Sequence, residues 1–443
     1  MSRYLGVTTS FLTYLRRSQL KRASIIKLQS KLFHQLLDYV FHHSPFYREF
    51  YLSHGIKEKD LKDITIDKLP CVDKALLMDN LDKVFTVSDL RKSEIEDWLA
   101  KDHEPQHLYK NKYRVLHTSG SSNRLGIFVY DGGSFDYAFS LGSLRISKDK
   151  VPFKKKLVYF GATHGHFTGA SLFASILSLL YEVKLISALD PMQQVIQTIN
   201  AFQPEKIVGY PSAISTLLEF ADQLDLNLTE IITSGEGETK NFVEKVKSTW
   251  KLTPIDVYST TESLVIGYKK SIDGPLTIFD DLNLFEVVDK NDQNVRPGET
   301  GKAIVTNLFN YVTPLIRYRM NDSIITESNS STSQFTQVKG ITARQLEPLP
   351  IVTDSGKKDF INALVLCDFF VPNVKEVQFV STSSRMVRIS YVSGKNVDEN
   401  VINEFKKMLL IKHACHGTKV EVQKVDFIKP DVSGKVQLIR IER

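Results

Sequence analysis

Short apolar runs alternate with amphipathic stretches through the middle of the chain. Strand-like runs fall at residues 157–160, 183–187, 206–209, 229–233 and 255–258, and helical patterns fall at 168–181, 191–202, 212–224 and 239–250. Repeated strand–helix alternation predicts a largely parallel sheet with helices on its faces. Ligands of such sheets bind outside the carboxyl ends of the strands. The segments that follow the strands are therefore the first candidates for a site.

Polar or glycine-bearing segments follow four of these strands. They are residues 161–169, Tyr210 with Pro211, residues 234–238, and residues 259–262. Because parallel strands of one sheet end at the same edge, we expect the four segments to converge on one rim.

The flanking regions have different patterns. Residues 10–60 look mainly helical, with a break at Ser44 and Pro45, because proline disfavours a helical residue before it. Strand-like runs at 113–117 and 127–130 flank a polar loop at 118–126, and residues 263–340 are rich in strands. Beyond residue 345 come strands near 374–380, 387–392 and 419–425 and a helix near 399–411.

These patterns predict an α/β protein of two domains. The first, residues 1–342, is a large N-terminal domain with mostly parallel sheets and a strand-rich subdomain. The second, residues 343–443, is a small C-terminal α/β domain, with the junction at 340–350. No apolar run reaches the ~20 residues that span a bilayer, and no signal core precedes residue 30, so we expect a cytoplasmic protein without a membrane span.

Composition narrows the function classes. Charged residues make up 24% of the chain and hydrophobic residues 42%, as in ordinary globular proteins. The three cysteines, Cys71, Cys367 and Cys415, are far apart, which argues against a disulfide framework and a multi-cysteine metal site. The net charge of +6 suits an anionic ligand but is too dilute to predict nucleic-acid binding.

Basic residues are frequent near the N-terminus. They are Arg16, Arg17, Lys21, Arg22, Lys27 and Lys31, and Leu20, Ile25, Leu28 and Leu32 lie between them. We interpret this stretch as a solvated helix face over a packed apolar stripe, in preference to a membrane-surface or RNA-binding helix.

The loop at 118–126 is suited to a phosphate. It has four hydroxyls, on Thr118, Ser119, Ser121 and Ser122, and Gly120 lets backbone amides approach an anion closely. It lacks the G-K-[ST] sequence of a Walker loop and leads into a strand rather than a helix. Considered alone, it is equally compatible with an ordinary Ser/Gly hairpin loop.

Three charged residues elsewhere have chemistry that fits the same ligand. Glu262 can hold Mg²⁺ directly or through water while the Thr261 hydroxyl contacts a phosphate oxygen. Asp322, which follows Arg317 and Arg319, can accept hydrogen bonds from the two hydroxyls of a ribose. Considered alone, the segment is equally typical of a pair of opposite charges at the surface. Lys435, after Gly434, can stabilise negative charge in a closed site, although alone it reads as one exposed lysine.

In this order the elements resemble adenylate-forming enzymes, the superfamily of acyl-CoA synthetases and adenylation domains. The similarity is greatest to the phenylacetate-CoA ligase-like branch, including its capsular-polysaccharide-associated members. The matching elements are the phosphate loop Thr118-Ser119-Gly120-Ser121-Ser122, the adenine-contacting turn Ser234-Gly235-Glu236, the Y-x-x-T-E element with Tyr258, Ser259, Thr261 and Glu262, the R-Y-R-x-x-D segment that ends at Asp322, and the lysine segment with Lys435. Ser44 to Tyr47 also resembles an N-terminal feature of this branch.

Two departures from the family pattern stand out. Asn123 and Leu125 occupy positions where the phosphate loop usually has glycine and proline, although asparagine tolerates a left-handed conformation. The usual G-R-x-x-D hinge is absent. We assign its arginine to Arg344, with Gln345 or Glu347 near the pivot.

The resemblance implies ATP-dependent activation of a carboxylic acid as an acyl-adenylate, with release of pyrophosphate and then transfer of the acyl group. Ser119 to Ser122 would hold the leaving phosphates, Glu262 the Mg²⁺, Asp322 the ribose, and Lys435 the reacting oxygens. Rotation of the C-terminal domain would remove Lys435 for the second step. We expect the acyl pocket near the residues that follow the strands on the same rim, namely His164, His166, Phe167, Thr168, Gly169 and Tyr210. His166 either meets a polar part of the substrate or packs in the wall.

The implied partners are a small carboxylic acid and an acyl acceptor. Coenzyme A, the thiol of a separate carrier protein, and an amine on a sugar or peptide all remain open, and neither the acid nor the oligomeric state is predicted. We expect no nucleic-acid partner. The alternative is a catalytically weak nucleotide-binding or scaffolding homologue that retains the fold without turnover.

Overall fold

The structure is a computed structural model of the whole chain. It describes residues 2–101, 107–118, 126–148, 155–161, 163, 168–173, 181–188, 190, 192–328, 333–343, 349–352, 358–361, 366, 369, 371, 374–383, 385–413, 418–430 and 436–442. Among the helices of these residues, none combines the length and the apolar character needed to cross a membrane.

Five parallel strands form one half of an eleven-stranded sheet. They lie in the order β4 (Tyr181–Ser187), β3 (Lys155–Gly161), β5 (Lys206–Gly209), β6 (Glu230–Ser234) and β7 (Ile255–Thr260). The helices between them include α10 (Met192–Phe202), α11 (Pro211–Leu218) and α12 (Lys240–Trp250). The predicted strand–helix alternation is therefore confirmed. A helix was expected at 168–181: α8 covers Thr168–Phe173, residues 174–180 lie outside the described residues, and Tyr181 begins a strand.

Antiparallel strands complete the same sheet. Beyond β7 they follow as β8 (Leu264–Lys269), β9 (Leu276–Ile278), β13 (Gln337–Ala343), β12 (Tyr318–Thr326), β11 (Thr300–Asn307) and β10 (Asn283–Val288). The parallel region and the strand-rich region that the sequence predicts are thus one continuous sheet. The change of direction falls between β7 and β8, which are antiparallel.

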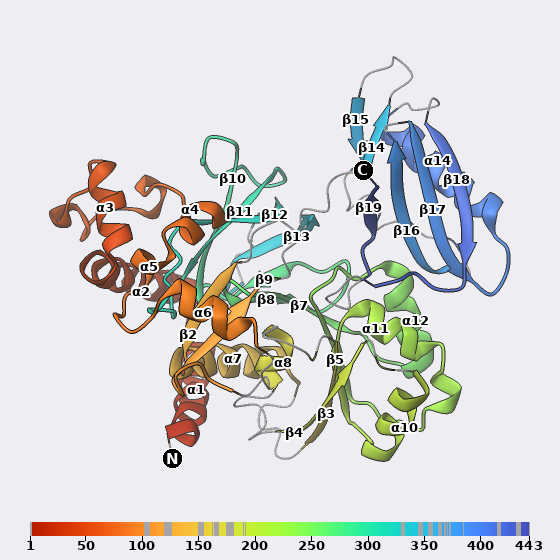
Figure 1. Cartoon of the computed structure of the whole chain (residues 1–443), viewed down its shortest axis with the longest axis horizontal. Helices are drawn as coiled ribbons and strands as arrows, with labels where there is room; N and C mark the ends of the chain where they lie inside the picture. Colours follow the sequence, from red (N-terminus) through yellow and green to blue (C-terminus); the bar gives the residue numbers. More distant parts are fainter. Residues whose placement is uncertain are drawn as a thin grey trace.

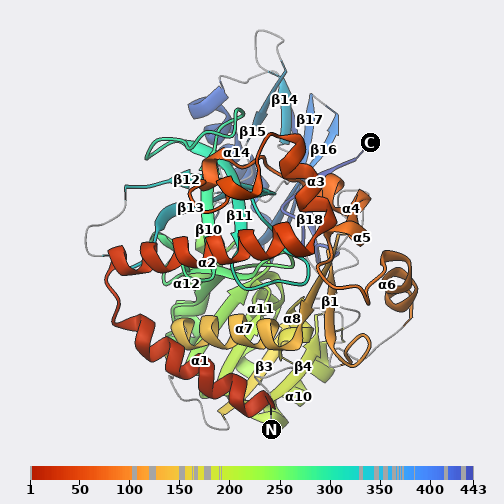
Figure 2. The ribbon, with the colours of Figure 1, turned by 90° about the vertical axis from the view of Figure 1, so that its left-hand side faces the viewer.

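Helices at the N-terminus cover one side of the molecule. α1 (Ser2–Ser18), α2 (Arg22–His43) and α3 (Pro45–Ser53) face the viewer in Figure 2, with α7 (Gly132–Ile146) beside α1. The break at Ser44 is confirmed: its Oγ caps α3 by accepting from the Tyr47 N–H, and Pro45 occupies the first turn. The basic stretch is not one helix, because the chain turns at residues 19–21.

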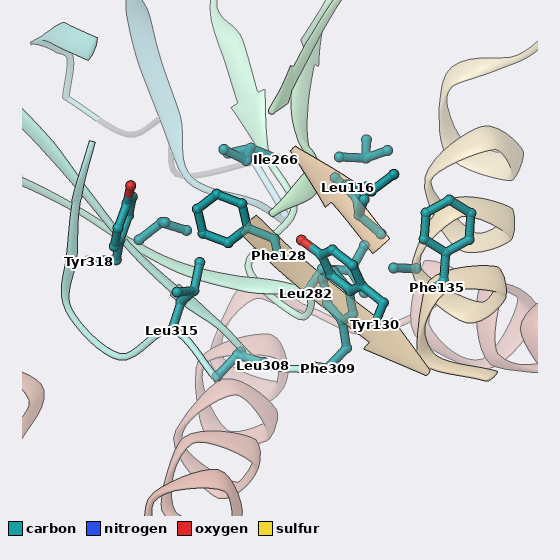
Figure 3. Packing of buried hydrophobic residues seen from close by; sticks show 14 of the residues in the cluster. Leu116, Phe128, Tyr130, Phe135, Ile266, Leu282, Leu308, Phe309, Leu315 and Tyr318 are labelled. Carbon is teal, nitrogen blue, oxygen red and sulfur yellow. The ribbon is translucent and has the colours of Figure 1, made fainter. Parts of the chain in front are cut away.

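Short helices and a hairpin connect this helical layer to the sheet. Along the chain come η1 (Glu58–Asp60), η2 (Ile66–Lys68), α4 (Lys74–Asp79), α5 (Leu81–Val84), α6 (Lys92–Leu99), β1 (Tyr113–His117) and β2 (Ile127–Asp131). Leu116 and Phe128 of the hairpin pack with Ile266 and Tyr318 of the large sheet in one buried cluster (Figure 3). The loop expected to bind phosphate connects β1 to β2, so its two ends are anchored in this core.

The C-terminal part has a sheet and core of its own. The sheet order is β18 (Lys419–Val425), β17 (Met386–Ser393), β16 (Val374–Ser383) and β19 (Ile439–Ile441), with α14 (Asp398–His413) against it and the pair β14 (Leu349–Val352) and β15 (Lys358–Ile361) nearby (Figure 1). Phe379, Ile389, Tyr391 and Phe405 are fully buried in a cluster separate from those of the large sheet. The predicted α/β fold with a large N-terminal and a small C-terminal part is confirmed.

Candidate active site

The carboxyl ends of β5, β6 and β7 meet at one rim. Gly209 lies opposite Thr233, and Ser234 lies opposite Val257, so the residues that follow each strand are brought level with one another. Gly161 at the end of β3 and Tyr210 after β5 belong to the same edge. The predicted convergence of the polar segments is confirmed where the chain is described.

Hydroxyls from two of these segments meet directly. Ser234 Oγ and Ser259 Oγ lie 2.6 Å apart and share a hydrogen bond. The next residue, Gly235, has φ of +88°, a conformation that glycine adopts without strain. Glu236 then turns back to α11, where its carboxylate accepts from the Ser212 N–H at 3.0 Å and from Ser212 Oγ at 2.9 Å. Hydrogen bonds between Ser234 and Ser259 and between Glu236 and Ser212 therefore hold both ends of this turn in place.

Asp322 and Tyr258 form a buried pair. The Tyr258 hydroxyl, on β7, donates to Asp322 Oδ2, on β12, at 2.5 Å, and both residues are almost fully buried. Hydrogen bonds to charged groups are short and about twice as strong as neutral ones. The pair therefore fixes the orientation of the Asp322 carboxylate, the group expected to contact a ribose.

Arg317, the first residue of the R-Y-R segment, binds partners outside that segment. Its guanidinium binds Glu286 with Nη2–Oε1 at 2.9 Å and Nε–Oε2 at 3.2 Å, and Nη1 donates to the Leu69 carbonyl at 2.7 Å. Arg319 pairs with Asp292 at the surface. The alternative interpretation of this segment as a surface charge pair does not describe Arg317, which is buried and pairs with Glu286 of β10.

The turn after β7 carries Thr261 and Glu262, and the hairpin holds it. The Tyr130 hydroxyl lies 2.9 Å from the Thr261 carbonyl oxygen and 2.7 Å from that of Glu262, within donating distance of both. Thr168 Oγ1, at the start of α8, lies 3.0 Å from Thr261 Oγ1. The structure thus brings Thr168, a residue of the expected acyl pocket, into contact with Thr261, which we expect to contact a phosphate oxygen.

Lys74 belongs to this cluster, although the sequence did not point to it. Its Nζ donates to Thr118 Oγ1 at 2.9 Å, and the same oxygen accepts from the Gly126 N–H at 3.1 Å. Burial lowers the pKa of Lys74, while the charge of Glu262 acts in the opposite direction. An ammonium group therefore stands at the base of the polar loop, within the field of Glu262.

The wall expected to contact the acyl group is closely packed around Tyr159. A Cβ on Gly169 would lie 2.0 Å from the Tyr159 hydroxyl, so a larger residue there would require the buried Tyr159 ring to move. Tyr210 is also buried beside Tyr159, and burial together with Tyr210 holds the pKa of Tyr159 well above its usual range. Gly169 therefore has a packing role whatever it contacts in addition.

The C-terminal sheet contacts the core next to the Glu236 turn. The Asn241 side chain of α12 donates to the Val374 carbonyl, and Lys375 pairs with Glu219, which also binds Lys245. Burial and the neighbouring charge of Glu236 raise the pKa of Glu376 from 4.5 to about 7.

Several expected site residues lie outside the described residues. They are Ser119, Gly120, Ser121, Ser122, Asn123, Leu125, His164, His166, Phe167, Arg344, Gln345, Glu347 and Lys435. Their roles remain predictions. Within the described ranges, no three His, Cys, Asp or Glu side chains gather as a metal site. A single carboxylate such as Glu262 is nevertheless a normal protein contribution to Mg²⁺, which keeps waters and takes further oxygens from phosphates.

Comparison with known proteins gives the same fold and related sequences. No protein-family model matches the chain. It is 21% identical over 411 residues to the protein CapK of Staphylococcus aureus, covering 87% of this chain and 81% of CapK. It is 25% identical over 338 residues to phenylacetate-coenzyme A ligase of Escherichia coli strain K12, covering 70% of each. The crystal structure of 2-hydroxyisobutyryl-CoA ligase in the postadenylation state superposes with a TM-score of 0.74, covering 97% of this chain and 92% of the ligase at 17% identity.

The chain is related in sequence and in fold to the adenylate-forming superfamily. The predicted resemblance to this superfamily is confirmed, and the likeness to CoA ligases supports the predicted enzyme class, an adenylate-forming ligase.

Proposed function

We propose that this protein activates a small carboxylic acid as an acyl-adenylate and then transfers the acyl group to a second nucleophile. One arrangement carries the proposal: Asp322 with Tyr258, Ser234 with Ser259, and Glu262 with Lys74 stand at one edge of the sheet. A carboxylate, a set of hydroxyls and an ammonium group are the chemistry that a ribose and a chain of phosphates require.

ATP fits this cluster in a defined direction. Asp322, oriented by Tyr258, would accept the ribose hydroxyls, while Ser234, Gly235, Glu236 and Ser259 would border the adenine. The loop with Ser119, Gly120, Ser121 and Ser122 would enclose the β- and γ-phosphates, with Thr118 and Lys74 at its base. Mg²⁺ held by Glu262 would neutralise phosphate charge.

The first step needs no proton transfer. An oxygen of the acid's carboxylate attacks the α-phosphorus, the bond from that phosphorus to the bridging oxygen breaks, and pyrophosphate leaves with the electron pair. Lys435 would stabilise the charge on the reacting oxygens, and Thr261 would contact a phosphate oxygen. Catalysis then rests on positioning and electrostatics.

The acid would lie near Thr168, Gly169 and Tyr210, with His164, His166 and Phe167 on the same segment. In the second step the acceptor attacks the acyl carbon and AMP leaves. Coenzyme A is the acceptor that the name of the Escherichia coli relative suggests, and a carrier thiol or an amine are the alternatives. We propose that residues 343–443 form a lid that turns about Arg344 between the two steps.

ATP–pyrophosphate exchange across a panel of carboxylic acids tests the proposal. We expect exchange that depends on one acid, and loss of about 100-fold or more in Glu262→Gln and Asp322→Asn. Lys302→Gln, an exposed change on β11, is the matched control and should exchange as the parent does. Silence across a broad panel, together with retained ATP binding, would favour the scaffolding alternative.

A further inference from the structure

The protein's net positive charge comes from its N-terminal helices α1 and α2. The first 37 residues contain seven Lys or Arg and no Asp or Glu, whereas the remaining 406 contain 50 Lys or Arg and 51 Asp or Glu. The excess of +6 over the whole chain is therefore carried by the N-terminal helices. The rest of the molecule is close to neutral.

Four of these cations are available to a partner. Arg17 binds the buried Asp281 at 2.7 Å and Arg22 lies 3.6 Å from Asp280, so both serve the fold. Arg16, Lys21, Lys27 and Lys31 are exposed, and none of them forms an ion pair within the described part of the chain. With no acidic residue on either helix before Asp38, nothing on them offsets this charge locally.

Aliphatic side chains are exposed among these cations. Leu12, Leu15 and Ile26 are 46%, 45% and 48% exposed, and among the described residues only Leu52 and Phe427 are comparably exposed large hydrophobics. Leu12, Leu15 and Arg16 are neighbours on α1 by helical spacing, as are Ile26, Lys27 and Ser30 on α2. The packed stripe expected from the sequence exists, since Ile25 is fully buried, but it does not include these three side chains.

Both helices present these residues on the same side of the molecule. α1 packs against α7 and α2 against β10, and the helices lie together at the front of the view in Figure 2. The exposed residues of the two helices consequently belong to one side of the molecule. We call this surface, formed by Leu12, Leu15, Arg16, Lys21, Ile26 and Lys27, the α1–α2 face.

We propose that the α1–α2 face docks on an anionic lipid surface. A face that combines Lys or Arg with exposed Leu and Ile matches both layers of a membrane interface, because the cations meet lipid phosphates while the aliphatic chains enter the acyl boundary. RNA-binding surfaces commonly expose aromatic rings on which bases stack, whereas the large hydrophobic residues exposed on the α1–α2 face are aliphatic. The helices lie on the surface and do not span the bilayer.

Vesicle sedimentation with the full chain tests this. The probes are vesicles of phosphatidylcholine mixed with phosphatidylglycerol and vesicles of phosphatidylcholine alone. We expect binding to the anionic vesicles that weakens with added salt, and little binding to the neutral ones. No binding to the anionic vesicles at low salt overturns the proposal, and so does equal binding to both kinds.

Matched double variants locate the surface. Lys21→Glu with Lys27→Glu should weaken binding by about tenfold or more. Lys395→Glu with Lys424→Glu makes the same change in charge in the C-terminal part, where Lys395 follows β17, Lys424 lies on β18 and both are exposed, and should leave binding near the parent's. Equal losses in the two variants would mean that net charge alone drives binding, and the assignment of binding to the α1–α2 face would be wrong.

The aliphatic residues separate lipid from RNA. Leu12→Ser with Leu15→Ser should weaken vesicle binding at moderate salt, whereas Phe427→Ser, at an exposed phenylalanine elsewhere, should not. All variants should melt as the parent does. Parent binding to polyuridine without binding to vesicles, or a change of solution size caused only by the α1–α2 variants, would assign the face to RNA or to a second copy and contradict the proposal.

Discussion

At the scale of single residues, the candidate site depends on groups that are oriented before a ligand arrives. Tyr258 fixes Asp322, Ser234 and Ser259 fix each other, and Glu236 is engaged with Ser212. Groups held in this way lose little freedom when they bind a ligand, which favours stabilisation of charge during a reaction.

Lys74→Met tests the residue that the sequence did not reveal. Loss of the ammonium group beside Thr118 should lower ATP–pyrophosphate exchange by about 100-fold and raise the KM for ATP, because a partly buried cation next to the phosphates would be lost. Lys83→Met, at an exposed lysine that pairs with Glu49, is the control. Exchange at the parent rate in Lys74→Met would remove this lysine from the site.

Tyr258→Phe isolates the hydroxyl that orients Asp322. A hydrogen bond to a charged group is worth about 1.5–3 kcal/mol, so the dissociation constant of ATP should rise about tenfold while the ring stays packed. Calorimetric titration of ATP into the two proteins measures the difference. An unchanged ATP affinity would show that Asp322 does not depend on the Tyr258 hydroxyl to bind ATP.

At the scale of elements, the R-Y-R segment that begins with Arg317 ties the antiparallel strands together. Arg317 connects β12 to Glu286 on β10 and to the Leu69 carbonyl before α4. The chain leading to Lys74 is thereby fastened to the sheet, since the Val72 N–H also donates to the Arg317 carbonyl. The motif arginine acts through the framework and does not contact Asp322 among the contacts that the structure describes.

Arg317→Met should destabilise the protein strongly. Removing one partner of a buried ion pair leaves the other charge uncompensated and costs about 3–5 kcal/mol. Arg319→Met, in an exposed pair with Asp292, should cost about 1 kcal/mol or less. Urea unfolding followed by fluorescence compares them, and equal midpoints would contradict the structural role.

At the scale of the whole molecule, contact between the C-terminal sheet and the core should depend on pH. Glu376 faces Glu236, and around it lie Lys375, which pairs with Glu219, and the backbone of Ile428. The docked form raises the pKa of Glu376 to about 7 from its ordinary 4.5, so this form holds the proton more tightly. Docking is therefore favoured at low pH, weakens as the pH rises from about 4.5 to about 7, and is constant above that.

Small-angle scattering of the ligand-free protein over this pH range measures the effect. We expect the radius of gyration to grow as the pH approaches 7 in the parent and to change much less in Glu376→Gln, which cannot ionise. Glu421→Gln, on exposed β18, is the control and should follow the parent. A parent that keeps one size throughout would contradict the pH dependence.

The sequence predicted features that depend on neighbours along the chain and missed those that depend on distant segments. Strand–helix alternation placed Tyr258 and Glu262 at the correct rim. Lys74 was missed because its contact with Thr118 joins residues 44 apart in the chain. The partner of Arg317 was missed for the same reason, since Glu286 is 31 residues away. The turn at residues 19–21 contains neither glycine nor proline, so no local signal marked it.

The two contacts of the Tyr130 hydroxyl have a consequence for redesign. One phenol joins the β1–β2 hairpin to the β7–β8 turn, so these two parts, which we propose face the nucleotide, would shift together under mutation. The segment at 163–173 touches that unit through Thr168. To make the protein accept a different carboxylic acid, this segment should therefore be varied while Tyr130 and Thr168 are kept. The selectivity for the acid could then change while the residues proposed to bind the nucleotide keep their positions.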